Sequence, residues 1–201
     1  MTRILVWDWP VRLGHWLLAG GFALAWLTAE RESLRLVHIA AGGTVLAVAA
    51  FRLLWGILGT RHARFAAFLR GPAAVRVYVL SLLGPRPEHH VGHNPAGGWA
   101  VVLLLGLSIL AGASGWCTNQ DLGGDWVAEL HEGLAATLLA LVMVHIGGVV
   151  VSSLVHRENL IRAMVSGYKA GPPAAALPSA RPAVAWLLLA WVVVVGWALV
   201  A

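Results

Sequence analysis

Cysteine is nearly absent from the sequence, with Cys117 the only one in 201 residues. A single cysteine cannot form a disulfide within the chain, and an iron–sulfur cluster typically takes four cysteine thiolates. No CxxCH motif occurs, which excludes the covalent attachment of a c-type haem. A redox group in this chain would therefore need ligands other than cysteine.

Charge is also scarce. Only 11% of the residues are charged, 59% are hydrophobic and the mean hydropathy is +0.78, whereas a soluble domain carries about 25% charged residues. This composition is typical of an integral membrane protein, so we expect a lipid bilayer around the chain. The sequence pI of 10.7 does not indicate nucleic-acid binding, because the basic residues lie in particular connections rather than along one helix.

Long apolar runs predict five membrane-spanning helices, since about 20 helical residues cross a bilayer core. Asp8 with Pro10, and Asn94 with Pro95, look like helix starts that combine an N-cap with a first-turn proline. The predicted spans are residues 10–28, 34–58, 96–116, 126–155 and 183–201. The expected fold is an all-α integral membrane protein, in which a four-helix transmembrane bundle is followed by a fifth C-terminal transmembrane helix.

The predicted domain organisation follows from these spans. Residues 1–167 form the bundle, residues 168–182 a Pro/Ala linker and residues 183–201 the fifth helix. The longest connection contains two short apolar stretches, 62–70 and 73–83, which are too short to span and are expected to lie at the membrane interface.

Basic residues fix the expected orientation. Nearly all Lys and Arg lie in the N-terminal segment and in the connections between spans two and three and between spans four and five. The opposite side carries only Arg31 and Arg35, beside several acidic residues. The positive-inside rule then places the N-terminus in the cytoplasm, and five spans leave the C-terminus on the outer side.

Four histidines sort into two pairs by depth. His131 and His145 are fourteen residues apart on the fourth span, which is about 3.9 helical turns and roughly 21 Å along the axis. His15 lies near the cytoplasmic end of span one, and His38 near the outer end of span two. The expected pairs are therefore His15 with His145 and His38 with His131.

Two imidazoles at one depth suit the axial positions of haem b, which binds without covalent links. Zinc would usually take four ligands, and each depth offers two. A single intramembrane histidine can also serve as a hydrogen-bonding residue between helices. Four histidines in two matched pairs favour two haem b groups over that interpretation.

Four stretches resemble the bacterial cytochrome b561 family, which includes the cytochrome b subunit of membrane-bound nickel–iron hydrogenases. They are WDWPVRLGHW at residues 7–16 and the longer stretches at 37–65, 92–116 and 130–167. The resemblance implies a bundle whose first, second and fourth helices hold two b haems, here through His15, His38, His131 and His145. It also implies a bacterial cytoplasmic (inner) membrane, so that the outer C-terminus is periplasmic, and electron transport between a periplasmic redox partner and membrane quinone.

Further residues have two interpretations each. Arg12, Arg52 and Arg35 lie near the membrane faces, where they would contact haem propionates or serve only as topology anchors. His93 and Asn94, at a helix start near the cytoplasmic haem, would contact a propionate or a quinone, or serve only in helix capping.

The expected function is electron transfer across the membrane by a di-haem cytochrome b, an oxidoreductase subunit rather than an independent enzyme. The partner would be a hydrogenase, another dehydrogenase or a c-type cytochrome, and the quinone would be ubiquinone or menaquinone. One alternative is a stand-alone superoxide:quinone oxidoreductase, which the acidic outer connections disfavour. A second alternative is a haem-poor membrane anchor for a soluble redox subunit. The fifth span has no histidine, so we expect it to dock a partner or close one face of the bundle.

Overall fold

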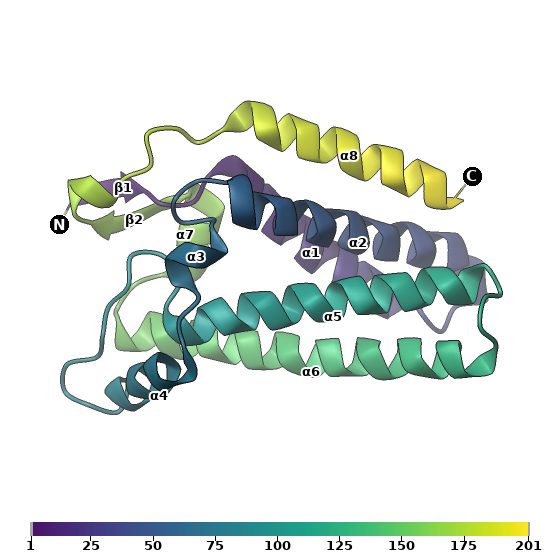
Figure 1. Ribbon diagram of the computed structural model, residues 1–201, viewed down its shortest axis with the longest axis horizontal. Coiled ribbons are helices and arrows are strands. Elements are labelled where there is room, and N and C mark those ends of the chain that lie inside the picture. The colour runs from purple at the N-terminus through teal and green to yellow at the C-terminus, as the bar shows by residue number, and fades with distance from the viewer. Residues whose placement is uncertain (1, 201) are drawn as a thin grey trace.

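The structure is a computed structural model that describes residues 2–200, with side chains described as far as Ala198. It is mostly helical, as predicted, and five long helices run roughly along one direction (Figure 1). They are α1 (Trp9–Thr28), α2 (Arg35–Leu58), α5 (Pro95–Asn119), α6 (Asp125–Val155) and α8 (Pro182–Val200). Their limits lie within about three residues of the predicted spans.

Local sequence explains where two of these helices begin. The Asp8 carboxylate accepts a 2.9 Å hydrogen bond from the Val11 amide, and the Asn94 side chain accepts one of 2.7 Å from the Gly97 amide. Each cap satisfies a backbone donor that lacks a partner within its own helix. The caps fix the first turns of α1 and α5.

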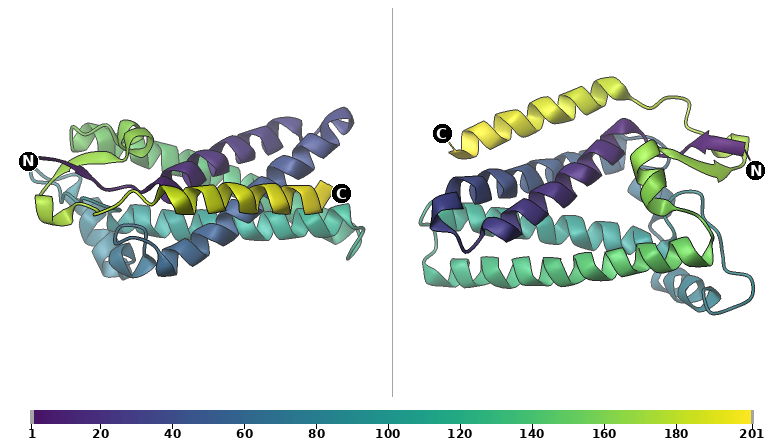
Figure 2. Two further views of the ribbon diagram at one scale, coloured as in Figure 1. Left: turned by 90° about the horizontal axis from the view of Figure 1, so that it is seen from above. Right: turned by 180° about the vertical axis from the view of Figure 1, so that it is seen from behind.

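The helices pack in sequence-neighbour pairs. Helix α1 packs on α2 and α5 on α6, and the two pairs are joined by contacts between α2 and α5. Helix α8 lies along α2 and α1, on the side of the molecule away from α6 (Figure 2). There the Leu188 side chain is fully buried, and the Trp191 indole N–H donates a 2.9 Å hydrogen bond to the Ala47 carbonyl.

Three helical segments are long and apolar enough to cross a membrane: Glu32–Leu58, Pro95–Asn119 and Asp125–Val155. The described apolar part of α8, Pro182–Ala198, is shorter. Large apolar side chains face outward on α2 and α6; Leu58 is 75% exposed and Leu154 73%. Such surfaces suit contact with lipid, and membrane crossing by α1 and α8 stays a prediction.

The short elements gather at one end of the molecule (Figure 1). They are strands β1 (Thr2–Leu5) and β2 (Tyr168–Gly171), helices α3 (Phe65–Phe68), α4 (Pro72–Ser81) and α7 (Leu160–Ser166), and the 3-10 turn Pro173–Ala175. The opposite end holds the connections from α1 to α2, with the 3-10 turn Glu32–Leu34, and from α5 to α6. One end thus contains the two strands and most of the short helices, and the other consists of short connections.

Part of the segment expected as a Pro/Ala linker, 168–182, is a β-strand. Strands β1 and β2 pair antiparallel, with Thr2 opposite Gly171 and Leu5 opposite Tyr168. The Pro/Ala composition of this segment predicts an extended linker. The strand could not be predicted, because its pairing partner lies more than 160 residues away in the sequence, beyond the reach of any local pattern. The small sheet is also a departure from a purely α-helical fold.

A buried carboxylate ties this end together. Besides capping α1, Asp8 accepts hydrogen bonds from the Trp55 indole at 3.0 Å and the Thr60 hydroxyl at 2.6 Å, and its side chain is fully buried. The beginning of α1 is therefore fixed to the end of α2. A small apolar core that includes Val6, Trp7 and Ala163 packs around this junction.

Candidate haem-binding site

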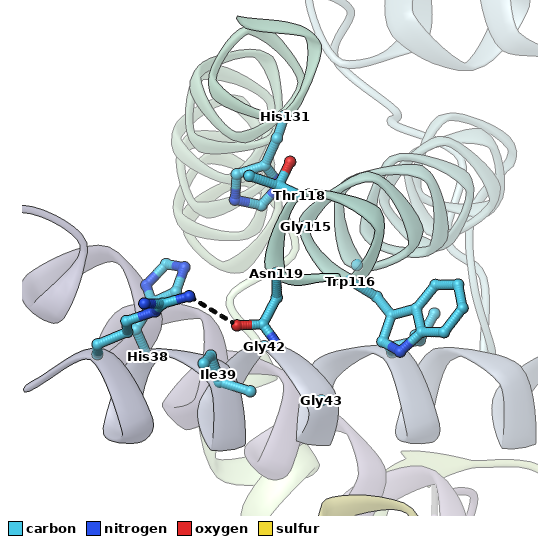
Figure 3. Close-up of a pocket in the computed structure, with 12 residues that line it drawn as sticks. His38, Ile39, Gly42, Gly43, Gly115, Trp116, Thr118, Asn119 and His131 are labelled. Atoms are coloured by element: carbon cyan, nitrogen blue, oxygen red, sulfur yellow. Dashed lines mark hydrogen bonds between the residues drawn. The ribbon is translucent and has the colours of Figure 1, made fainter. Parts of the chain in front are cut away.

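His38 of α2 and His131 of α6 project into the same pocket (Figure 3). Their ring centroids are 6.1 Å apart and the ring planes are nearly perpendicular, at 87°. Metal–imidazole bonds of about 2 Å on either side of one iron would place two axial rings about 6 Å apart, centroid to centroid. The spacing of this outer pair therefore fits a single metal between the rings.

The outer pair is also oriented for ligation. His38 Nδ1 lies 2.9 Å from the Ala25 carbonyl oxygen and His131 Nδ1 lies 2.9 Å from the Ala111 carbonyl oxygen. A carbonyl only accepts, so each Nδ1 carries the proton and donates it. The Nε2 lone pair of each ring is then available to a metal, as in most histidine metal sites.

Glycines shape the pocket around these rings. Gly42 and Gly115 both line it. A Cβ placed on Gly115 would lie 2.8 Å from His131 Cε1, so only glycine lets the ring occupy this position. A Cβ placed on Gly42 would meet nothing within 4 Å, which leaves open space on the helix face that presents His38. A flat macrocycle needs such clearance.

Arg35 stands at the rim of the pocket. Its guanidinium donates a 3.2 Å hydrogen bond to the Asn119 side chain, and it is exposed (Figure 3). A cation at a wet rim suits a carboxylate such as a haem propionate.

His15 of α1 and His145 of α6 form the inner pair of the prediction, and they are less closely placed. His15 packs edge-on against Trp16 at 5.0 Å, and its Nδ1 is buried without a hydrogen-bond partner. Within the described residues no ring contact joins His15 to His145, and α1 and α6 share no extensive packing. A Cβ added to Gly148, three residues beyond His145, would meet nothing within 4 Å. The helix face beside His145 therefore has room next to Gly148.

Comparison with known proteins decides which group this is. The profile of the prokaryotic cytochrome b561 family matches residues 6–167, which is most of the chain. The chain belongs to the prokaryotic cytochrome b561 family. It is thus a membrane b-type cytochrome that carries haem b and serves in electron transport, and the family predicted from the sequence is confirmed.

Curated relatives of this cytochrome carry one name, probable Ni/Fe-hydrogenase B-type cytochrome subunit. The protein of Azotobacter vinelandii is 29% identical over 217 residues, covering 84% of this chain and 89% of the relative. Those of Cupriavidus necator and Rhizobium leguminosarum are each 26% identical and cover 82% of this chain, with 86% and 87% of the relative. No solved structure shows a significant match.

Two arginines of the cytochrome are partly engaged by protein. Arg12 donates to the Val165 carbonyl and lies 4.1 Å from the Trp9 ring centroid, while its Nε is buried without a partner. Arg52 is 8% exposed and donates a 2.9 Å hydrogen bond to the Ala63 carbonyl, while its Nη1 is buried without a partner. Each guanidinium therefore keeps one buried donor free for an anion.

His93 and Asn94 have different surroundings. The Asn94 side chain caps α5. The His93 ring lies between Trp7 and Phe68, at centroid distances of 4.7 and 4.5 Å. Burial, together with the positive charges of Arg52 and Lys169, lowers the pKa of His93 to about 3. His93 is neutral at physiological pH and would meet a ligand as a hydrogen-bonding group, not as a cation.

The structure also shows a polar cluster that the sequence analysis missed. The ammonium group of Lys169, on β2, is buried and lies 3.0 Å from a Glu158 carboxylate oxygen, and His89 Nε2 lies 3.4 Å from the same oxygen. Lys169 also donates a 3.3 Å hydrogen bond to the His90 carbonyl. The sequence gives no signal for this cluster, because its members come from three separate segments: strand β2, the connection from α6 to α7 and the connection from α4 to α5.

Proposed function

We propose that this cytochrome is a di-haem electron-transfer subunit that carries electrons across the cytoplasmic membrane between a periplasmic redox partner and the quinone pool. The observation that carries the proposal is the outer pair, in which two half-buried histidines from different helices face one pocket at the spacing of axial ligands. His38 and His131 hold the outer haem b, and His15 and His145 hold the inner one.

The histidine pairs suit electron transfer because they would fill both axial positions of each iron and because the outer pair is held in place. Haem b provides a one-electron couple when bound. Two imidazoles per iron leave no open position for oxygen, which favours electron transfer. The Ala25 and Ala111 carbonyls hold the rings of the outer pair, so little reorganisation accompanies a change of charge.

Helix α6 determines how far an electron travels between the two proposed haem sites. His131 and His145 are fourteen residues apart on one continuous helix, so the two sites are about 21 Å apart along its axis. This separation covers most of a bilayer core that is about 30 Å thick.

The small sheet supports the proposed topology. Strands β1 and β2 pair directly, so residues 2–5 and 168–171 must lie on the same side of the membrane. An even number of crossings must therefore separate them. Three of the intervening helical segments have the length and apolarity to cross, and α1 as a fourth crossing gives the even number that the sheet requires. In this proposal α8 is a fifth crossing and ends on the opposite side.

Charge supports the orientation. The end that carries the sheet holds twelve basic and three acidic residues, and the opposite end holds two basic and six acidic ones. By the positive-inside rule the sheet lies in the cytoplasm, and the outer haem faces the periplasm. The relatives are named as hydrogenase subunits, so a periplasmic nickel–iron hydrogenase is the partner we favour. Ubiquinone or menaquinone accepts the electrons on the cytoplasmic side, near His93 and Asn94.

Counting bound haem tests the proposal. Alanine variants of His15, His38, His131 and His145 should each lose one of two haems, measured by the pyridine haemochrome assay per mole of purified protein. His89→Ala, at a histidine outside both pairs, is the matched control and should keep both. Two haems retained in all four ligand variants would refute the ligand assignment, and a wild-type protein without haem would leave only an anchoring role.

A further inference from the structure

The two histidine pairs differ in the hydrogen bonds made by their Nδ1 atoms. In the outer pair both Nδ1 atoms donate to backbone carbonyls at 2.9 Å. In the inner pair, His15 Nδ1 is buried and has no acceptor. The inner pair thus has at least one imidazole without the support that both outer imidazoles receive.

A hydrogen bond from Nδ1 to a carbonyl makes an imidazole a more basic ligand. A more basic axial ligand donates more electron density and stabilises the ferric form over the ferrous form. Hydrogen bonding around the ligands is one of the means by which a protein sets haem potentials. The carbonyls of Ala25 and Ala111 therefore act to lower the reduction potential at the outer site.

Ala25 is well placed for this effect. It lies in the last turn of α1, which ends at Thr28, where backbone carbonyls carry the negative end of the helix dipole. Its carbonyl also accepts a 3.2 Å hydrogen bond from the Thr28 hydroxyl. The partial negative charge there further favours the ferric form.

Charge at the inner site acts in the opposite direction. Arg12 lies one helical turn before His15, and Arg52 is largely buried; each has a buried nitrogen without a partner. The fully buried Asp8 carboxylate offsets part of the Arg52 charge, so the three groups together leave a net positive charge at this end. A buried cation favours the added electron of the ferrous form, because low dielectric strengthens the attraction. At the outer end the one nearby cation, Arg35, is exposed and bonded to Asn119, and six acidic residues outnumber two basic ones.

We infer that the outer site, His38 with His131, has the lower reduction potential and the inner site, His15 with His145, the higher one. Electrons that enter at the outer face then move to the cytoplasmic side down a gradient that the ligand surroundings build into the bundle. The inference rests on the proposed function, in that it takes the four histidines as haem ligands.

Redox titration of single-haem variants tests this order. We expect wild-type protein in mild detergent to titrate in two one-electron steps separated by at least tenfold in equilibrium constant, which is about 59 mV. His131→Ala should retain the haem of the higher-potential step, and His15→Ala the haem of the lower-potential step. The reverse assignment, or a single unresolved step in the wild type, overturns the inference, whereas variants that keep both haems overturn the ligand assignment instead.

A second measurement does not require the loss of a haem. A nitroxide attached to Leu122→Cys, in a Cys117→Ala background, reports on the outer site, because Leu122 is 49% exposed in the α5–α6 connection. Ferric low-spin haem is paramagnetic and ferrous low-spin haem is not, so enhancement of nitroxide relaxation should disappear with the lower-potential step. A nitroxide at Val165→Cys, near Arg12 at the other end, should follow the higher-potential step. If the nitroxide at position 122 follows the higher-potential step and the one at position 165 the lower-potential step, the inference is wrong.

Discussion

The imidazole of His131 shows how closely single atoms define this site. Its Nδ1 lies 2.9 Å from the Ala111 carbonyl oxygen and 3.4 Å from the Ser114 hydroxyl, and Gly115 makes room for the ring. Spacing along the sequence was enough to predict that His131 and His38 share a depth. The sequence could not predict which carbonyls hold them, because Ala25 and Ala111 come from neighbouring helices whose rotation depends on packing over their whole length.

Gly42 offers a test of the space beside the outer pair. Gly42→Leu should place a branched side chain where an added Cβ meets nothing within 4 Å. Under the proposed di-haem assignment, it should lower the haem content from two per chain towards one. The absorbance of the α band per mole of protein measures the loss. Gly20→Leu is the matched control, because Gly20 is equally open but lines a groove between α1 and α2 that contains no histidine. Equal haem content in both variants would show that no cofactor lies against Gly42.

Among the elements, the long helices followed from sequence and the small sheet did not. Apolar runs, Asp8 and Asn94 are local signals, and they place α1 and α5 within a few residues of their observed ends. Strand β2 has only four residues, Tyr168–Gly171, and its pairing with β1 depends on the whole bundle between them. Helix α8 was predicted as a helix, but its position along α2 and α1 required the structure.

The packing of α8 predicts a structural role for it. Leu188→Ala removes a fully buried side chain from the contact with the bundle and should cost about 2–5 kcal/mol. The midpoint of thermal unfolding in detergent should fall by several degrees, while the haem content stays unchanged because α8 has no histidine. Trp186→Ala, at a side chain that is 71% exposed, is the control and should leave the midpoint near wild type. Loss of haem in Leu188→Ala alone would instead place α8 in support of the haem site.

The molecule as a whole has two chemically different ends. One end gathers the small sheet, most of the basic residues and the buried polar groups Asp8, His93 and Lys169. The other end is acidic and consists of short connections. Composition and charge alone predicted this polarity and the membrane environment. The N-cap role of Asp8 was predicted, but the burial of His93 and Lys169 was not, because a histidine or lysine in a polar connection is usually solvated.

Protonation of His93 should lower the folding stability of the chain at acidic pH. Its pKa is about 3 in the folded chain and about 6.5 when unfolded, so between these values only the unfolded chain binds the proton. Stability is therefore lost as the pH falls from 6.5 towards 3. His93→Phe retains the packing between Trp7 and Phe68 but has no group that titrates. We expect its unfolding midpoint to fall less between pH 7 and pH 5 than the midpoint of the wild-type protein. A variant with the same decline as wild type would contradict this account.

The pairing of Thr2–Leu5 with Tyr168–Gly171 also has a consequence for biosynthesis. The first strand leaves the ribosome before any helix, but its partner is translated only after α6. At about 5–20 residues per second, the first strand waits on the order of 10 to 30 s while the four long helices α1, α2, α5 and α6 are synthesised. Closure of the sheet is thus a late event in maturation, and a chain truncated within α6 would leave its leading strand without its native partner.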